Sequence, residues 1–589
     1  MSLERHFQDE ITFIKSTVQD FADAHPQLPQ FIIEESADPD VERLLDGLAF
    51  LTGTLKAKLE QDFPELVQSL LMLLWPNYLR PTPSMTILDA SICESSSSIF
   101  IPKGTEVSDR PLEQPACIFR TCRDLSVHPL EITNTTLSRD IAGDFLFITF
   151  NFENALPIKS LNELQLYLGS DSHIGYQLYL MLSHYMQSAS VVINEVELPV
   201  NLTFSPVGMS NADAMLPYPA NTNLGNRLLQ EYFCFPEGLL FLNMHHKEQN
   251  LFPANVHHTF GLKVRFTRSF PKNLKIRKDS IKINCVPAVN LFSHDGEPVI
   301  LTGKKTQYPL VPSYKYPDGF EIFSVEHVES CRRHKRASKN SHEYTYLPFD
   351  SFEHQIQFDK SYQRLYYNIK QTQDMASGNI RHWISFVRGD EELWQNIDET
   401  ISVRYICTNK DLPSQLRIGD IYTRVSKKTA GLSGSVLLTN ITRPTMQLLP
   451  MLDESQYWTT ISKLAQNYKS LLNLDSLKQV LLSYNFPAMH NRQSEKSALK
   501  KLSGIQKIET RQAERKIANG LVVRGSETSL YIKQSVFNSE GELYLFGTVL
   551  AQFFSQYATL NSFHLLTMVN TDNQERYTWP VNIGQHSLI

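Results

Sequence analysis

The sequence lacks the features that mark several common classes of protein. No apolar run approaches the roughly 18 residues of a membrane-spanning helix, and the tightest apolar cluster, residues 70–75, ends at Pro76. The first residues show no basic stretch followed by an apolar one, so no signal peptide is expected. The formal net charge of −6 argues against a dedicated nucleic-acid binder, which would carry a strong basic excess.

Cysteine is scarce, and its spacing excludes a disulfide framework. Seven cysteines are scattered over 589 residues, which favours a reducing compartment. Cys117 and Cys122 are spaced wrongly for a zinc knuckle, and we interpret them as buried free thiols. Charged residues make up only 20% of the chain and apolar residues 42%, so packed cores are expected rather than disorder. Aromatic residues, at 11%, suit β-rich cores and large buried interfaces.

Motifs that carry chemistry are also missing. The sequence has no phosphate-binding loop and no glycine-rich dinucleotide motif, and residues 431–435 depart from the spacing of a nucleophile elbow. The histidine pairs 245–246 and 257–258 could meet across a hairpin, but no carboxylate or cysteine completes a metal site at recognised spacing. The acidic clusters 34–35 and 390–392 are interpreted as exposed turns. We therefore predict no catalytic residue, no cofactor and no metal.

The first 84 residues predict a helical region. Apolar residues recur there at spacings of three and four, which is typical of the seam of a helical bundle. The first seam ends before Pro26, and the second helix begins at residues 38–40 with a capping pattern. Two successive seams favour a bundle-forming arm, although packing on its own domain would give a similar pattern. The seam residues predicted as a protein interface are Phe7, Ile11, Ile14, Val18, Phe21, Leu44, Leu48 and Leu51.

From Met85 the apolar period changes to two, which is typical of β-strands. The predicted fold class is α+β and multidomain. Its parts are an N-terminal helical region (1–84), a β-rich middle domain (85–286), a second β-rich domain (287–440) and a mixed α/β C-terminal domain (441–589). Middle strands are expected at 145–152, 164–168, 190–196, 239–242, 261–266, 280–285, 321–325 and 382–387, with a helix at 174–186. In the last part we expect helices at 461–472, 475–484 and 549–557, strands at 542–546 and 562–569, and a loop at 489–501.

A basic run follows Cys331. It places five fixed positive charges in eight residues, from Arg332 to Lys339, and could contact an acidic partner or phosphate. A solvated loop is the alternative, and the lack of aromatic residues in the run weakens a role in binding nucleic acid. We include Arg332 and Arg333 among the candidate interface residues.

Blocks of sequence spread over nearly the whole chain resemble the TssF (VasA, ImpG) family, which are baseplate subunits of the type VI secretion system. The N-terminal blocks are residues 37–51, 63–66 and 75–85, the last of which reads WPNYLRPTPSM. The later blocks are residues 285–292, 308–312, 321–325, 407–413, 443–445, 524–527, 546–550 and 579–580. An ordered series of this length is more specific than any single motif.

The resemblance implies a structural protein without catalytic residues. It implies a baseplate wedge of two copies of this chain with one TssG-like chain, six wedges around the spike hub, and contacts with TssK-like and TssE-like proteins. The family is similar to wedge proteins of contractile phage tails, and a cytoplasmic bacterial location docked at the inner membrane is expected. The alternatives are a β-rich hydrolase or metal-binding enzyme with an unrecognised site, and a nucleic-acid scaffold that uses residues 332–339.

Overall fold

The computed structural model describes most of the chain after residue 74. The described residues are 47, 68, 70–72 and 75–583, except 95–97, 110–114, 142, 153–162, 219–223, 247–258, 272–273, 302–304, 333–341, 350–364, 375–377, 389–398, 426–433, 451, 453–460, 462–472, 517–521, 557 and 559–561. Apart from residues 350–356 and 452–461, the chain from Pro76 onward forms one compact unit. The predicted N-terminal helices and the helix at 461–472 lie outside the described residues, and the four domain boundaries stay predictions.

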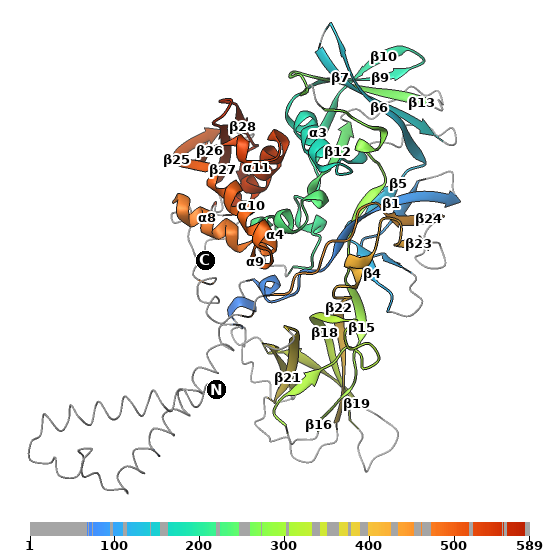
Figure 1. Cartoon of the computed structure of the whole chain (residues 1–589), viewed down its shortest axis with the longest axis vertical. Helices are drawn as coiled ribbons and strands as arrows, with labels where there is room; N and C mark the ends of the chain where they lie inside the picture. The colour runs from blue at the N-terminus through green and yellow to red at the C-terminus, as the bar shows by residue number, and fades with distance from the viewer. Residues whose placement is uncertain are drawn as a thin grey trace, which may run out of the picture. The chain divides into compact units, whose positions relative to one another are not determined.

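The unit is mostly β-sheet, and its first sheet joins strands that are far apart in the sequence (Figure 1). β1 lies between β14 and β24 and is antiparallel to both. The sheet runs in the order β23-β24-β1-β14-β4-β3. Its inner face packs around Leu88, Val286 and Leu438, which are fully buried. The bounds are β1 Met85–Glu94, β3 Glu106–Ser108, β4 Ile118–Thr121, β14 Cys285–Val289, β23 Tyr422–Val425 and β24 Ser435–Asn440; β2 (Ile99–Ile101) pairs with β5 (Leu125–Val127) beside it.

Two further antiparallel sheets follow β5. One has the order β10-β9-β13-β7-β6 and the other β11-β12-β8. Buried and half-buried residues alternate along β7, as the period of two predicts. The bounds are β6 Leu130–Asp140, β7 Gly143–Phe152, β8 Glu163–Tyr167, β9 Met186–Ile193, β10 Val196–Val200, β11 Leu202–Pro206, β12 Phe241–His246 and β13 Thr259–Phe266. The helices here are α3 (Ser172–His184) and α4 (Leu224–Cys234).

Most predicted elements of the middle region are confirmed, and three need correction. The predicted strand 239–242 begins only at Phe241, because Pro236–Leu239 form a 3₁₀ helix. The predicted strand 190–196 is interrupted by a turn, because Asn194 and Glu195 both have positive φ angles. The predicted strand 280–285 is wrong except at Cys285, where β14 begins. Asn284 lies in the left-handed region (φ 57°), and its side-chain amide donates to the carbonyl of His128, so the chain turns where extended backbone was expected.

The largest sheet has the order β15-β22-β18-β19-β20-β21-β17, with β16 pairing to β22. β18 and β21 include the strands predicted at 321–325 and 382–387. β18 carries two bulges against β22, at Phe323 and at Glu326. The bounds are β15 Phe292–Asp295, β16 Val299–Leu301, β17 Tyr308–Leu310, β18 Glu321–Arg332, β19 His342–Pro348, β20 Leu365–Gln373, β21 Ile380–Arg388 and β22 Glu399–Thr408.

The C-terminal part combines helices with a mixed sheet in the order β25-β26-β27-β28 (Figure 1). β26 and β27 run parallel, and α11 connects them, as a crossover between parallel strands requires. The helices are α8 Leu474–Ser483, α9 Phe486–His490, α10 Arg492–Ser503 and α11 Glu540–Ser555. The strands are β25 Ile505–Lys516, β26 Val522–Ile532, β27 Phe563–Asn570, β28 Arg576–Thr578 and β29 Asn582–Ile583.

The polar segment 489–501, predicted as a loop, is mostly the helix α10. Asn491 caps this helix by accepting a hydrogen bond from the Gln493 N–H, and two lysines occupy its last turn. Only Ala498 and Leu502 are buried, so the apolar stripe is too narrow to have been noticed in the sequence. The helix predicted at 475–484 is α8, and Asn473 caps it by accepting a hydrogen bond from the Asp475 N–H.

The predicted strand 542–546 is wrong because these residues lie in the first half of α11. Ser539 caps that helix by accepting from the Glu542 N–H, and two glutamates in the first turn favour the helix dipole. α11 is buried on nearly all sides, so its apolar residues do not form one stripe. The predicted helix 549–557 is its second half, and the predicted strand 562–569 is β27.

Close backbone approach fixes α11 against α3. A Cβ atom at Gly541 would lie only 1.9 Å from the carbonyl oxygen of Tyr176, so this position has no room for a side chain. We predict that Gly541→Ala lowers the free energy of unfolding by about 1–3 kcal/mol, because the helices must move apart. Thermal and urea unfolding measure this. Ser497→Ala, at an exposed position of α10, is the control, and equal stability of the two variants would contradict the packing argument.

Glu321 begins β18 as a buried carboxyl group, 5% exposed. Burial raises its pKa from 4.5 to about 7, against the opposing effects of Lys410 and the Ile322 N–H. Because the folded state holds this proton more tightly, the stabilisation is complete below pH 4.5 and is lost as pH rises through about 7. We predict that Glu321→Gln removes about 3 kcal/mol of this decline in unfolding free energy. Urea unfolding across that pH range tests it, with the exposed Glu326→Gln as control, and an unchanged slope would contradict it.

Candidate interaction site

The structure does not bring the predicted interface residues together. Both N-terminal seams lie outside the described residues. Arg332 is the last residue of β18, where it is opposite His342 of β19 and Glu399 of β22 in the strand register, and Arg333 lies outside the described part. The interface role of these residues therefore stays a prediction.

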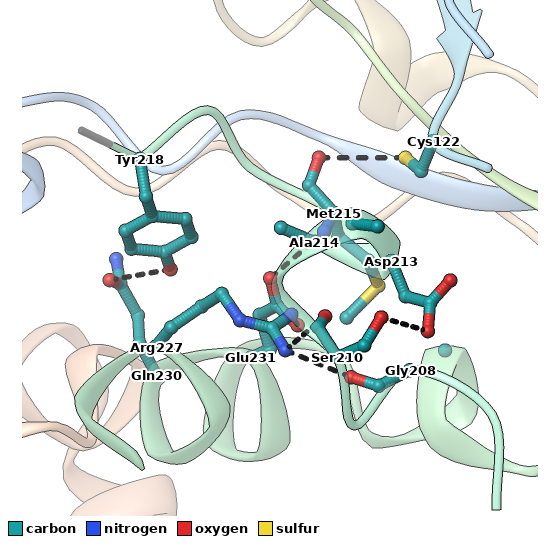
Figure 2. A network of polar contacts seen from close by, with 12 residues as sticks. Cys122, Gly208, Ser210, Asp213, Ala214, Met215, Tyr218, Arg227, Gln230 and Glu231 are labelled. Carbon is teal, nitrogen blue, oxygen red and sulfur yellow. Dashed lines mark hydrogen bonds and ion pairs between the residues drawn. The ribbon is translucent and has the colours of Figure 1, made fainter. Parts of the chain in front are cut away.

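A buried polar cluster surrounds α4 (Figure 2). Leu228, Leu229 and Tyr232 follow a helical spacing and are buried, which explains why this segment forms a helix. Arg227 and Glu231 lie on the same helix four residues apart and are also buried, with side chains at most 2% exposed. Arg227 Nη1 donates to Glu231 Oε2 over 2.8 Å. A buried charge pair of this kind needs further hydrogen bonds to offset the loss of water.

Those further bonds come from the loop between β11 and α4. Arg227 Nη2 donates to the carbonyl oxygens of Gly208 and Ser210, each at 3.0 Å, and Glu231 Oε1 accepts from the Met215 N–H at 2.9 Å (Figure 2). Gly208 has a φ of +93°, a conformation that favours glycine. The ion pair on the helix therefore fixes the path of the loop.

A second buried arginine holds the same loop from the other side. Arg123 Nε donates to the carbonyl of Asp213, and its Nη2 donates to the carbonyl of Gly238. The neighbouring thiol of Cys122 donates to the Met215 carbonyl. Burial raises the pKa of this thiol to about 12, so it stays protonated and unreactive at neutral pH. Cys117 and Cys122 are both free and buried, which confirms the sequence interpretation.

The network ends at the first residues of the compact unit. Tyr218 donates its hydroxyl to Gln230 Oε1 at 3.1 Å, and the carbonyl of the preceding Pro217 accepts from Asn77 Nδ2 at 3.2 Å. Asn77 in turn accepts from Arg80 Nη1 at 3.1 Å through its Oδ1. The loop thus connects α4 to residues 77–80, which lie in and just after the short 3₁₀ turn Pro76–Tyr78.

The arrangement positions backbone and does no evident chemistry. The donors and acceptors of the ion pair other than Arg227 Nε bind each other or peptide groups, and its side chains are closed to solvent. Among the described residues, no three His, Cys, Asp or Glu side chains converge as a metal site would require. His245 Nε2 lies 2.7 Å from the hydroxyl of Ser205, and the second histidine pair is not described. In the described regions, every helix is too short or too polar to cross a bilayer.

A groove of about 340 Å³ lies beside the network, between the end of α4, helices α9 and α10, and α11. Lys501 Nζ and Glu542 Oε1 form an ion pair at 2.5 Å on its wall. Its other lining residues include Phe233, Pro487, Ser494, Leu502, Phe537 and Phe546. Both polar and apolar groups face this groove, and nothing in the structure indicates what would fill it.

Sequence reasoning missed the whole network. The signal available was the i, i+4 spacing of Arg227 and Glu231 among apolar residues at helical spacing. That spacing also occurs on exposed helices, so it does not reveal burial. The bonds to Gly208 and Met215 join residues 19 and 16 positions apart through backbone atoms, which leave no trace in the sequence.

Comparisons with known proteins match nearly the whole chain to TssF proteins. The family model described as "Type VI secretion system, TssF" matches residues 1–586. The type VI secretion system component TssF1 of Pseudomonas aeruginosa is 24% identical over 640 residues, which cover 99% of this chain and 98% of the relative.

Two solved structures are similar to the described fold. A chain in the structure of the type VI secretion system TssK-TssF-TssG baseplate subcomplex has a TM-score of 0.77 and 26% identity, covering 92% of this chain and 98% of that one. A chain of the type VI secretion baseplate complex has a TM-score of 0.62 and 22% identity over the full length of both, which supports the fold alone.

The buried ion pair should contribute strongly to stability. We predict that Arg227→Met lowers the unfolding free energy by about 3–5 kcal/mol, because Glu231 would be left charged and buried. Arg524→Met removes an exposed pair with Glu514 and should cost less than about 1 kcal/mol. Urea unfolding of both variants measures the difference, and comparable losses would show that burial of the first pair does not matter.

Proposed function

Because the chain belongs to the TssF family of the type VI secretion system, whose members are structural baseplate subunits and not enzymes, we propose that it assembles with TssG-like and TssK-like chains as a wedge of the baseplate. The match of the family model to residues 1–586 carries this proposal. The likeness to a chain of a TssK-TssF-TssG subcomplex, at a TM-score of 0.77, supports it independently of any single motif.

In the proposed wedge, two copies of this chain bind one TssG-like chain. Six wedges surround the spike hub, and a TssE-like protein and a TssK-like protein complete the contacts with sheath and membrane complex. The two apolar seams near the N-terminus support a bundle with a partner, since each buried large apolar side chain stabilises by roughly 1.5–3 kcal/mol. The basic run from Arg332 is a second proposed contact, toward an acidic surface.

The chemistry of the described residues suits a scaffold. Burial raises the pKa of the Cys117 thiol to about 12, which disfavours a nucleophilic role. Burial also lowers the pKa of His382 to about 4, so this imidazole is neutral at physiological pH and a poor general acid. The buried arginines near α4 bind backbone carbonyls rather than facing a cavity. These features favour a rigid scaffold over an enzyme that turns over a substrate.

Mass measurement of the assembled complex tests the proposal. We expect co-expression with a TssG-like chain to give a complex of two copies of this chain per partner by light scattering after size exclusion. A monomer that ignores the partner would contradict the proposed function.

Variants of the first seam test the proposed bundle. We predict that Ile11→Asp with Ile14→Asp abolishes the complex, because two charges would have to be buried. Thr12→Asp with Ser16→Asp adds the same charge between the seam positions and should leave the complex intact. Normal assembly of the first double variant would exclude the seam from the interface.

A further inference from the structure

Arg80 is a half-buried cation that is held by an amide and an aromatic ring. Its Nη1 donates to Asn77 Oδ1, and its guanidinium carbon lies 5.2 Å from the centre of the Phe323 ring. Its Nε is closed to solvent and has no hydrogen-bond acceptor. Among the residues that the structure describes, no acidic side chain forms an ion pair with it. Burial is the one cause that shifts its pKa, to about 10, so the group stays charged at neutral pH.

A bulge in β18 places the Phe323 ring against the Arg80 guanidinium. Phe323 is the extra residue of the first bulge in β18, between the pairs Ile322–Cys407 and Ser324–Ile406. A bulge re-aims the side chain at that position, and such features are typical of sites with a function. Phe323 is 2% exposed, and a cation over an aromatic face is attracted by the ring quadrupole. The sheet therefore gives Arg80 a platform on one side.

The other buried arginines of this region lie near carboxylates of the chain. Arg227 is paired with Glu231, whereas burial lowers the pKa of Arg123 and the attraction of Glu231 and Asp213 opposes that shift. Arg80 has an amide and an aromatic ring instead. A ring and an amide oxygen hold a guanidinium in place without cancelling its charge. An unneutralised charge kept at a fixed position is costly for the isolated chain, which calls for an external partner.

We propose that Arg80 is an anchor for a carboxylate carried by another protein chain of the baseplate. The inference rests on the proposed function, since it requires that the chain assembles with other chains. Asn77 occupies Nη1 and the Arg80 residue is half-buried, so Nη2 is the end of the guanidinium fork that receives the aspartate or glutamate. Asn77 is itself held by the carbonyl of Pro217, so the loop fixed by α4 sets the position of the anchor.

Removal of the charge distinguishes two roles for Arg80. If its role is internal, the variant loses stability; if it binds a partner, the variant loses affinity in the complex. We expect Arg80→Met to leave the thermal midpoint of the isolated chain unchanged or raised, because methionine fills the same space without a buried charge. In the co-expressed complex, the same variant should raise the dissociation constant by roughly tenfold or more and flatten its dependence on salt. Arg80→Lys, which keeps the charge but not the planar fork, should fall between the two.

Arg227→Met is the matched control because that arginine is neutralised within the chain. It should lower the midpoint of the isolated chain, whereas the exposed Arg524→Met should change neither stability nor assembly. If Arg80→Met destabilises the isolated chain as Arg227→Met does, Arg80 is an internal element and the inference is wrong. The inference is also wrong if the wild-type complex forms normally and Arg80→Met does not change its dissociation constant.

Two further outcomes separate the inference from its alternatives. If inorganic phosphate stabilises the isolated wild-type chain but not Arg80→Met, while complex formation is equal, the site takes a free anion and not a partner carboxylate. If the wild-type chain forms no complex with TssG-like and TssK-like chains, the proposed function itself fails, and the anchor fails with it.

Discussion

The burial of the Arg227–Glu231 ion pair is the constraint from which the rest of this region follows. Two charges removed from water need partners for their remaining donors and acceptors. Here the carbonyls of Gly208 and Ser210 and the N–H of Met215 supply them for all but Arg227 Nε. The loop that supplies them has no regular hydrogen-bonding pattern of its own beyond a short 3₁₀ turn. Its course is therefore set by the helix that follows it, and its Pro217 carbonyl accepts a hydrogen bond from Asn77 Nδ2.

A second constraint is that the first sheet is held together by strand pairs that are far apart in the sequence. β1 is hydrogen-bonded to β14 about 200 residues later and to β24 about 350 residues later, as the register shows. Thr86 donates to the carbonyl of Thr442, and the N–H of Met85 donates to the hydroxyl of Thr445. Non-local pairing of this kind is slow to form but rigid once formed. It suits a subunit whose role is to hold other chains at fixed positions.

Local patterns in the sequence predicted most elements of the fold, and particular residues explain the failures. The alternation in β7 is visible because this strand has one fully buried face. α11 is buried almost all round, so the run from Glu542 to Phe546 had no helical stripe to detect. α10 is exposed almost all round, so its caps carried the signal. The candidate site was not predictable, because its bonds run from side chains to distant backbone atoms.

The contrast among the buried arginines links fold to assembly. Where a charge serves only the folded chain, as at Arg227, a carboxylate lies one helical turn away and supplies the opposite charge. At Arg80 the same network supplies position, through Asn77 and the bulged Phe323, but no opposite charge. A scaffold subunit that satisfied every buried group internally would have no electrostatic reason to prefer a partner. Leaving one fixed cation uncompensated makes the isolated chain less favourable than the assembled one, and gives the assembly a point of specificity.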